Sequence, residues 1–120
     1  MSINITNSLG KITYTDEYLS DIVGLCAVEC YGIVGMSSKR AVDGVIEFLK
    51  GENLKKGVKI TVENDDLNID LFVVVEYGVS IAAVAKNVIH TVKYNVEKFT
   101  GLNVIDVNVV VDGIRINGEI

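Results

Sequence analysis

Few side chains in this chain have types and spacings that could do chemistry. Cys26 and Cys30 lie four residues apart in a predicted helix, which puts both on one face. Thiolates at this spacing could bind a metal, but a metal site needs more ligands, and the one histidine, His90, lies far along the chain. We therefore expect two small buried apolar side chains, with neither a metal site nor a disulfide.

The residues of a hydrolytic or acid–base site are also not grouped. A catalytic nucleophile needs a nearby histidine and an orienting carboxylate, whereas His90 stands on the polar side of a predicted helix. Asp65 and Asp66 could hold a cation or act as acid and base, but they fall in a predicted hairpin turn, where such residues are expected for backbone reasons. No phosphate-binding or dinucleotide-binding glycine motif occurs. We expect no enzyme, no catalytic residues and no cofactor.

A GxxG motif, Gly32-Ile33-Val34-Gly35, is the one candidate for nucleic-acid binding. KH domains clamp the backbone of single-stranded nucleic acid with a GxxG loop, and here Lys39 and Arg40 follow closely. The two central side chains are apolar and offer nothing to a phosphate. The main interpretation is a helix end that leads into a buried strand, and a KH-like binder of single-stranded nucleic acid is the alternative.

The net charge of −5 is unevenly distributed. Residues 36–60 contain six basic and three acidic residues, so this segment is positive while the remainder is strongly acidic. An acidic body argues against general nucleic-acid binding, because such domains are usually basic throughout. The segment could contact an anionic lipid or an acidic partner, or it could be a solvated loop; its basic residues are Lys39, Arg40, Lys50, Lys55, Lys56 and Lys59.

Composition predicts one globular domain over residues 1–120. Hydrophobic residues make up 49% of the chain and charged residues 22%, which is typical of a folded domain with its own core. The longest uninterrupted block of large apolar residues, 71–75, is far too short to span a membrane. The N-terminal residues lack the basic and apolar regions of a signal peptide. The expected compartment is the cytoplasm.

Two amphipathic helices are predicted. The first is capped by Thr15 or Asp16 and stopped by Gly32, and the second begins at Ser80 and ends at Gly101. Each carries an apolar stripe with helical spacing. The stripes are Leu19, Ile22, Val23, Cys26 and Cys30 in the first, and Ile81, Val84, Ala85, Val88, Val92, Val96 and Phe99 in the second.

Strands are expected around residues 11–14, 33–36, 58–63, 68–77 and 103–111, with a hairpin turn in the sequence NDDLN. Two strand–helix–strand units favour parallel pairing, and the hairpin between them is antiparallel. We therefore predict an α+β fold, in which a mixed sheet of about four to five strands carries the two helices on one face. A short weak helix is predicted from Val42, Val45, Ile46 and Leu49.

The strand of sequence NIDLFVVVE is apolar on both faces along its second half. Ile69, Leu71, Val73 and Val75 are expected in the core, with Ile60 and Val62 of the hairpin and with Ile105, Val107, Val109 and Val111 of the last strand. The other face is expected to carry polar residues and Val104 at its rim and an apolar centre of Phe72, Val74 and Val110. The cover for that centre is either the weak helix or another molecule, because interaction surfaces have this apolar centre and polar rim.

Three stretches together resemble the alkaline shock protein family of Gram-positive bacteria, also described as envelope stress response or YloU-like proteins. They are GKITYTDEYLSDIVGLCAVECYGIVGM, KKGVKITVENDDLNIDLFVVVEYGVSIAAVAKNV and VEKFTGLNVIDVNVVVDGI, and the resemblance covers residues 9–116. The chain departs from the family pattern at AVECYGI, where members more often have Pro-Gly, and it lacks the long charged tails of some members.

The resemblance implies a small cytoplasmic, non-enzymatic protein tied to cell-envelope homeostasis. It also implies a scaffold or adaptor that self-associates or binds a protein partner, since some members self-assemble and are held near the membrane by a membrane protein. No active-site residues belong to the family, so none are carried over to this chain.

Overall fold

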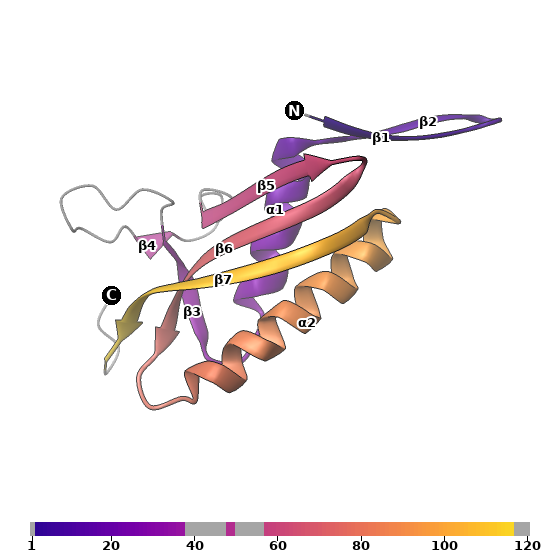
Figure 1. Ribbon diagram of the computed structural model, residues 1–120. Helices are drawn as coiled ribbons and strands as arrows, with labels where there is room; N and C mark the ends of the chain where they lie inside the picture. The colour runs from indigo at the N-terminus through magenta and orange to yellow at the C-terminus, as the bar shows by residue number, and fades with distance from the viewer. Residues whose placement is uncertain (1, 38–47, 50–56, 117–120) are drawn as a thin grey trace.

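A computed structural model describes residues 2–37, 48–49 and 57–116. The fold is α+β, with a two-stranded sheet and a separate five-stranded sheet (Figure 1). The elements are β1 (Ser2–Asn7), β2 (Gly10–Thr15), α1 (Asp16–Val28), β3 (Ile33–Ser37), β4 (Phe48–Leu49), β5 (Val58–Glu63), β6 (Asp66–Glu76), α2 (Ile81–Thr100) and β7 (Asn103–Arg115).

Both helices begin with the expected capping residues. The Thr15 hydroxyl accepts a hydrogen bond from the backbone N–H of Tyr18, and the Ser80 hydroxyl accepts one from Ala83. At the end of α2, Gly101 has a φ of 74° and donates its N–H to the carbonyl of Glu97. The predicted second helix is therefore confirmed at both of its ends.

β6 is the central strand of the five-stranded sheet. β7 pairs with it in parallel along one edge, whereas β5 and β3 pair antiparallel with its first and second halves along the other. The β5–β6 hairpin turns at Asn64 and Asp65, whose φ angles of 52° and 66° suit a tight two-residue turn. The predicted hairpin and the parallel β6–α2–β7 unit are both present.

The second predicted parallel unit is absent from the described part of the chain. β2 pairs with β1 in a hairpin that projects beyond the main sheet, and β3 pairs antiparallel with β6 (Figure 1). The side chain of Asn7 closes the hairpin by accepting hydrogen bonds from the N–H groups of Leu9 and Gly10. This local pairing costs little loop-closure entropy, which is why β2 finds its partner within the chain's first residues.

The core lies between the sheet and the two helices. Ile69, Leu71, Val73 and Val75 of β6 are buried there as predicted, with α1 and α2 contributing their apolar stripes. The α2 residues of this cluster are Val84, Val88, Val92 and Val96, and those of α1 include Leu19, Val23 and Cys26. Figure 1 shows α1 behind the sheet and α2 lying alongside β7.

The predicted faces of β7 were wrong at its beginning. A register shift between Leu67 and Asn68 leaves Ile105 without a partner position on β6, so the alternation of β7 slips by one residue. Val104, expected at the outer rim, is therefore fully buried in the core, whereas Ile105, expected in the core, is 44% exposed.

The weak helix predicted over residues 42–49 does not extend to its last residue. Leu49 pairs with Met36 in the short strand β4, so this end of the segment is extended. Val42, Val45 and Ile46 lie outside the described residues.

Candidate functional site

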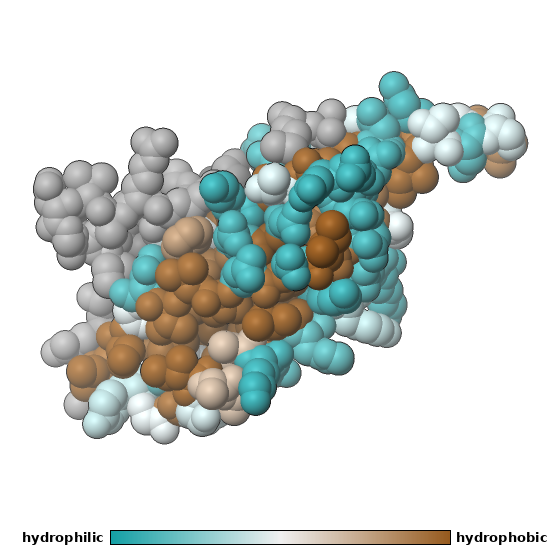
Figure 2. All heavy atoms as spheres, in the orientation of Figure 1, coloured by the Kyte–Doolittle hydropathy of each residue, from teal (hydrophilic) through white to brown (hydrophobic). Residues whose placement is uncertain are grey.

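The outer face of the sheet, opposite the helices, carries the predicted apolar centre. Phe72 of β6 and Val110 of β7 lie directly opposite each other in the parallel ladder. Phe72 is half-buried and Val110 is 39% exposed. Figure 2 shows apolar side chains gathered over the C-terminal halves of β6 and β7. We call Phe72, Val74 and Val110 the outer-face patch.

Val74 contributes little open surface to this patch, because it is only 5% exposed although it lies outside the main core cluster. Its register partners are glycines on both sides, Gly35 of β3 and Gly113 of β7. Close by, the Ser37 hydroxyl of β3 donates to the Asp112 carboxylate of β7 at 2.6 Å, although β6 lies between these two strands. The exposed part of the patch is therefore narrower than the sequence predicted.

Polar residues border the patch along β6. Asp70 and Asn108, two residues before Phe72 and Val110 on the same face, are joined by a hydrogen bond of 2.9 Å from the amide of Asn108. Beyond the patch, Arg115 lies 3.8 Å from Glu76. Ile114 and Ile116 are also about half exposed, near the C-terminal end of β7, but they are not part of the patch. A second register shift, between Val73 and Val74, pairs Ile114 with the core residue Val75, so Ile114 is on the other face of the sheet.

The two cysteines are buried in the core, as predicted. The Cys30 thiol donates to the backbone carbonyl of Cys26 at 3.4 Å. Burial raises the pKa of both thiols, and the nearby Glu29 carboxylate raises it further. Raised pKa values keep both groups as neutral thiols, which are poor nucleophiles and poor metal ligands.

His90 lies exposed on α2, in a shallow hollow of about 220 Å³ with Lys93, Tyr94 and Glu97. Two of these neighbours already make structural contacts. Lys93 donates to the carbonyl of Val104 and Glu97 accepts from its N–H, each at 3.0 Å, so α2 holds the start of β7. Asp65 occupies the hairpin turn. Within the described ranges, no three His, Cys, Asp or Glu residues group as metal ligands would.

The GxxG motif is built into the sheet. Gly32 has a φ of 87°, and its carbonyl accepts a hydrogen bond from the N–H of Glu76. Ile33 is buried, and Gly35 pairs with Val74 in the β3–β6 ladder. The backbone that a KH loop would offer to nucleic acid is thus already used, and the KH-like alternative gains no support from this geometry.

Of the predicted basic segment, only Lys59 is among the described residues. Lys59 is exposed on β5, opposite Asp70 in the β5–β6 ladder. The other five basic residues of that prediction, Lys39, Arg40, Lys50, Lys55 and Lys56, lie outside the described residues.

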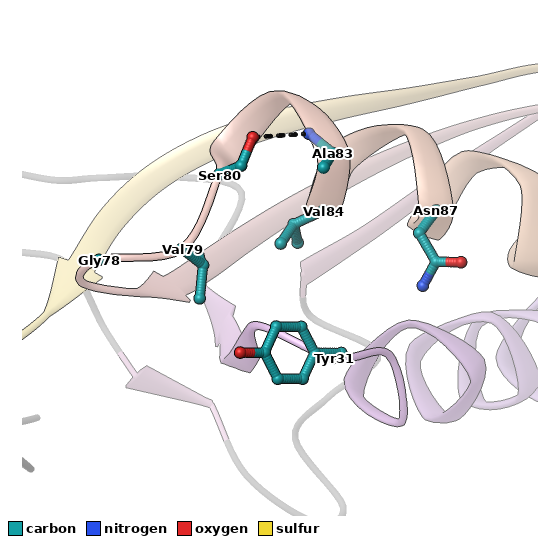
Figure 3. Close-up of a pocket in the computed structure, with 7 residues that line it drawn as sticks. All are labelled: Tyr31, Gly78, Val79, Ser80, Ala83, Val84 and Asn87. Atoms are coloured by element: carbon teal, nitrogen blue, oxygen red, sulfur yellow. Dashed lines mark hydrogen bonds between the residues drawn. The ribbon is translucent and has the colours of Figure 1, made fainter.

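A hollow of about 480 Å³ lies at the start of α2, and Figure 3 shows the residues around it. The Tyr31 ring lies across from Val84 and Val79, and the Ser80 hydroxyl is directed to the N–H of Ala83. The serine is engaged as a helix cap, so the walls offer apolar contacts from Val79 and Val84 and polar groups from Tyr31 and Asn87. No pattern in the sequence indicated this hollow.

None of the described helices has the length and apolar character needed to cross a membrane. No solved structure matches the chain.

The comparisons with known proteins agree with one another. Residues 4–116 match the model of the alkaline shock protein 23 family, described as having a cell envelope-related function. The uncharacterized protein YloU of Bacillus subtilis (strain 168) is 42% identical over 97% of this chain and 98% of its own length. The uncharacterized protein Spy1614 of a Streptococcus pyogenes serotype M6 strain is 38% identical over 99% of both chains. A stress response regulator gls24 homolog of S. pyogenes serotype M3 is 28% identical over 95% of this chain and 64% of its own. The chain therefore belongs to the alkaline shock protein 23 family, the cell envelope-related proteins that its sequence resembles.

Proposed function

We propose that this chain is a non-enzymatic scaffold or adaptor of the cell envelope, and that the outer-face patch mediates its association with a second copy or with a protein partner. One observation carries the proposal: Phe72 and Val110 form an apolar centre beside the hydrogen-bonded pair Asp70 and Asn108. An apolar centre within polar surroundings is the common composition of protein interfaces. The family's description as having a cell envelope-related function supports a role at the cell envelope.

The exposed part of the patch supports a weak association by itself. Complete burial of a Phe or Val side chain gains about 1.5–3 kcal/mol, and Phe72 is already half-buried while Val110 is 39% exposed. The two together could therefore add about 1–2 kcal/mol. Association that depends on concentration, or on being held beside other copies, is the form that such a surface favours.

We place this role in the cytoplasm, close to the membrane through a membrane-anchored partner. A scaffold of this kind needs no span of its own, which agrees with the described helices.

Multi-angle light scattering over a range of protein concentrations tests the proposal. Wild type should gain mass as concentration rises, and Phe72→Glu or Val110→Asp should shift that rise to higher concentration. Ile105→Asp is the matched control, because Ile105 is about equally exposed on the same strand but outside the patch. Circular dichroism must show that the variants are folded. If wild type is monomeric at every concentration, the proposed self-association is wrong. If Val110→Asp and Ile105→Asp have equal effects, the outer-face patch is not the surface that mediates association.

A further inference from the structure

A second apolar surface lies on the other side of the molecule, between the two helices. A groove of about 640 Å³ runs between α1 and α2. Its α1 wall is formed by Tyr18, Ile22, Leu25, Cys26 and Glu29, and its α2 wall by Asn95 and Phe99. Both helices pack on the core face of the sheet, so the groove and the outer-face patch are on opposite sides.

The groove presents large apolar side chains to solvent. Tyr18 is 50% exposed, Leu25 is 52% exposed and Phe99 is 60% exposed. Tyr18 is stiffened by the stacked ring of Tyr14, at 6.2 Å between ring centroids. A partly exposed aromatic ring that already packs against a neighbour, as Tyr18 does, makes a good anchor for a partner, because little side-chain entropy is lost on binding.

The spacing along α1 fits a helical partner. The wall residues Tyr18, Ile22, Leu25 and Glu29 follow one face of α1 over three turns, a length of about 16 Å at about 1.5 Å per residue. A groove between two helices receives a third helix through side chains spaced at i, i+3 or i+4, and i+7. An extended strand would gain little here, because helices have no free backbone edge to pair with.

The charge on the α1 wall of the groove is one-sided. The sequence has no Lys or Arg from residue 12 to residue 38, whereas α1 and its C-cap carry Asp16, Glu17, Asp21 and Glu29. Two lysines of α2 make contacts away from α1: Lys93 donates to the Val104 carbonyl, and Lys98 lies over the Tyr94 ring. The α1 wall is therefore an apolar stripe beside carboxylates.

Glu29 occupies a position that is unfavourable for helix stability. It is the C-cap of α1, where the negative end of the helix dipole favours Lys, Arg or His, and the last turn contains no basic residue. Glu29 therefore adds negative charge to the groove without stabilising α1.

We propose that the α1–α2 groove binds an amphipathic helix of a partner protein, with apolar residues on one face and Lys or Arg beside them. The charge decides between occupants. The α1 helix of a second copy would bring like charges together, and an anionic lipid surface would be repelled by the same carboxylates. The inference does not depend on the proposed role of the outer-face patch.

Synthetic peptides supply the probe. A fluorescent peptide of about 18 residues, made of Leu and Lys with its leucines on one helical face, is titrated with the full chain. A Leu/Glu peptide with the same leucine positions is the comparison. By fluorescence anisotropy at low salt, we expect the Leu/Lys peptide to bind at least about tenfold more tightly. Leu25→Lys and Glu29→Lys should each weaken that binding by about tenfold.

Glu63→Lys is the matched control, since it changes the net charge by the same amount as Glu29→Lys at an exposed position on β5, outside the groove. It should alter the affinity less than about twofold. Equal weakening by Glu63→Lys and Glu29→Lys means general attraction to an acidic protein and overturns the proposal. If Leu25→Lys impairs folding, the result for Glu29→Lys alone tests the proposal, because a lysine at the C-terminal end of α1 should stabilise the helix.

Two further outcomes would also overturn the inference. If Leu25→Lys has a lower mass than wild type in light scattering, the groove is an interface between copies of the chain. If wild type sediments with vesicles rich in anionic lipid and Leu25→Lys does not, the groove is a lipid-binding site. Val110→Asp should leave peptide binding unchanged, so a failure of the outer-face patch is distinguishable from a failure of the groove.

Discussion

Gly32→Ala is the sharpest test of the structural role assigned to the GxxG motif. A Cβ atom at Gly32 would lie 2.5 Å from Cγ2 of Val84, a buried β-branched side chain with little freedom to move. The φ of 87° costs a non-glycine residue about 1–2 kcal/mol, and overpacking a core costs about 1–3 kcal/mol more. We expect the free energy of unfolding to fall by about 2–5 kcal/mol, measured by urea denaturation followed by circular dichroism.

Gly78→Ala separates the two contributions. Gly78 has a similar φ of 94°, but a Cβ added there meets nothing within 4 Å. The free energy of unfolding of Gly78→Ala should fall only by the conformational cost of the positive φ, about 1–2 kcal/mol. In a Val84→Ala background, where the two methyl groups are gone, Gly32→Ala should also cost less than in wild type. Equal losses for Gly32→Ala and Gly78→Ala in the wild-type background would refute the argument that this turn is packed against α2.

Three smaller changes test other parts of the structure. Ser37→Ala removes the 2.6 Å hydrogen bond to the partly buried Asp112 carboxylate and should lower the free energy of unfolding by about 1–3 kcal/mol in urea denaturation; no loss would mean that this bond is absent in solution. Thr15→Ala removes the cap of α1 and should cost about 1 kcal/mol, whereas Thr15→Asp, which restores a capping oxygen, should cost little. The pKa values of Cys26 and Cys30 are raised in the folded state, so the thiols of the unfolded chain ionise first as the pH rises. The contribution of the buried thiols to the free energy of unfolding should therefore be fully present below about pH 9 and be lost above it. Urea midpoints at about pH 8 and about pH 10 should differ less in a Cys26→Ala/Cys30→Ala variant, and an unchanged difference would contradict the raised pKa values.

Local signals predicted the elements that depend on local chemistry. The N-cap Ser80, the C-cap Gly101 and the turn at Asn64 and Asp65 place α2 and the β5–β6 hairpin where the sequence predicts them. Each of these signals acts within a few residues of its own position, so tertiary contacts had little to override.

In the sheet, the features that the sequence did not predict depend on register. A bulge adds one residue to a strand without changing its composition, so alternation cannot reveal it. At Ile105 this single residue exchanges the core and rim positions at the start of β7. The same limit applies to the outer-face patch: alternation placed Phe72 and Val110 on one face, but the near-complete burial of Val74 depends on which residues flank it in β3 and β7.

The exposed side chains of the α1–α2 groove were hidden by the amphipathic pattern itself. Phe99 continues the apolar stripe of α2 and was expected in the core, yet it is 60% exposed, whereas Val92 and Val96 earlier in the same stripe are buried. The buried residues of α2 recur every fourth position from Val84 to Thr100, so Phe99 lies at the side of the buried stripe. A helical period says which residues share a face, but not how wide a part of that face its neighbours cover.

The two surfaces differ in the interactions that they favour. The outer-face patch is small, and one of its three residues is nearly closed, so its apolar area alone supports weak, concentration-dependent contacts. The groove combines exposed aromatic anchors with carboxylates, and α1 has no basic residue. The groove should therefore prefer a positively charged partner, a preference that the patch lacks. Because the sheet separates the two surfaces, a basic helix bound in the groove would leave Phe72 and Val110 free for a second contact. A domain with one selective site and one weak site on opposite faces can be held in place by the first and gathered into assemblies by the second, since local enrichment raises the effective concentration at the weak site.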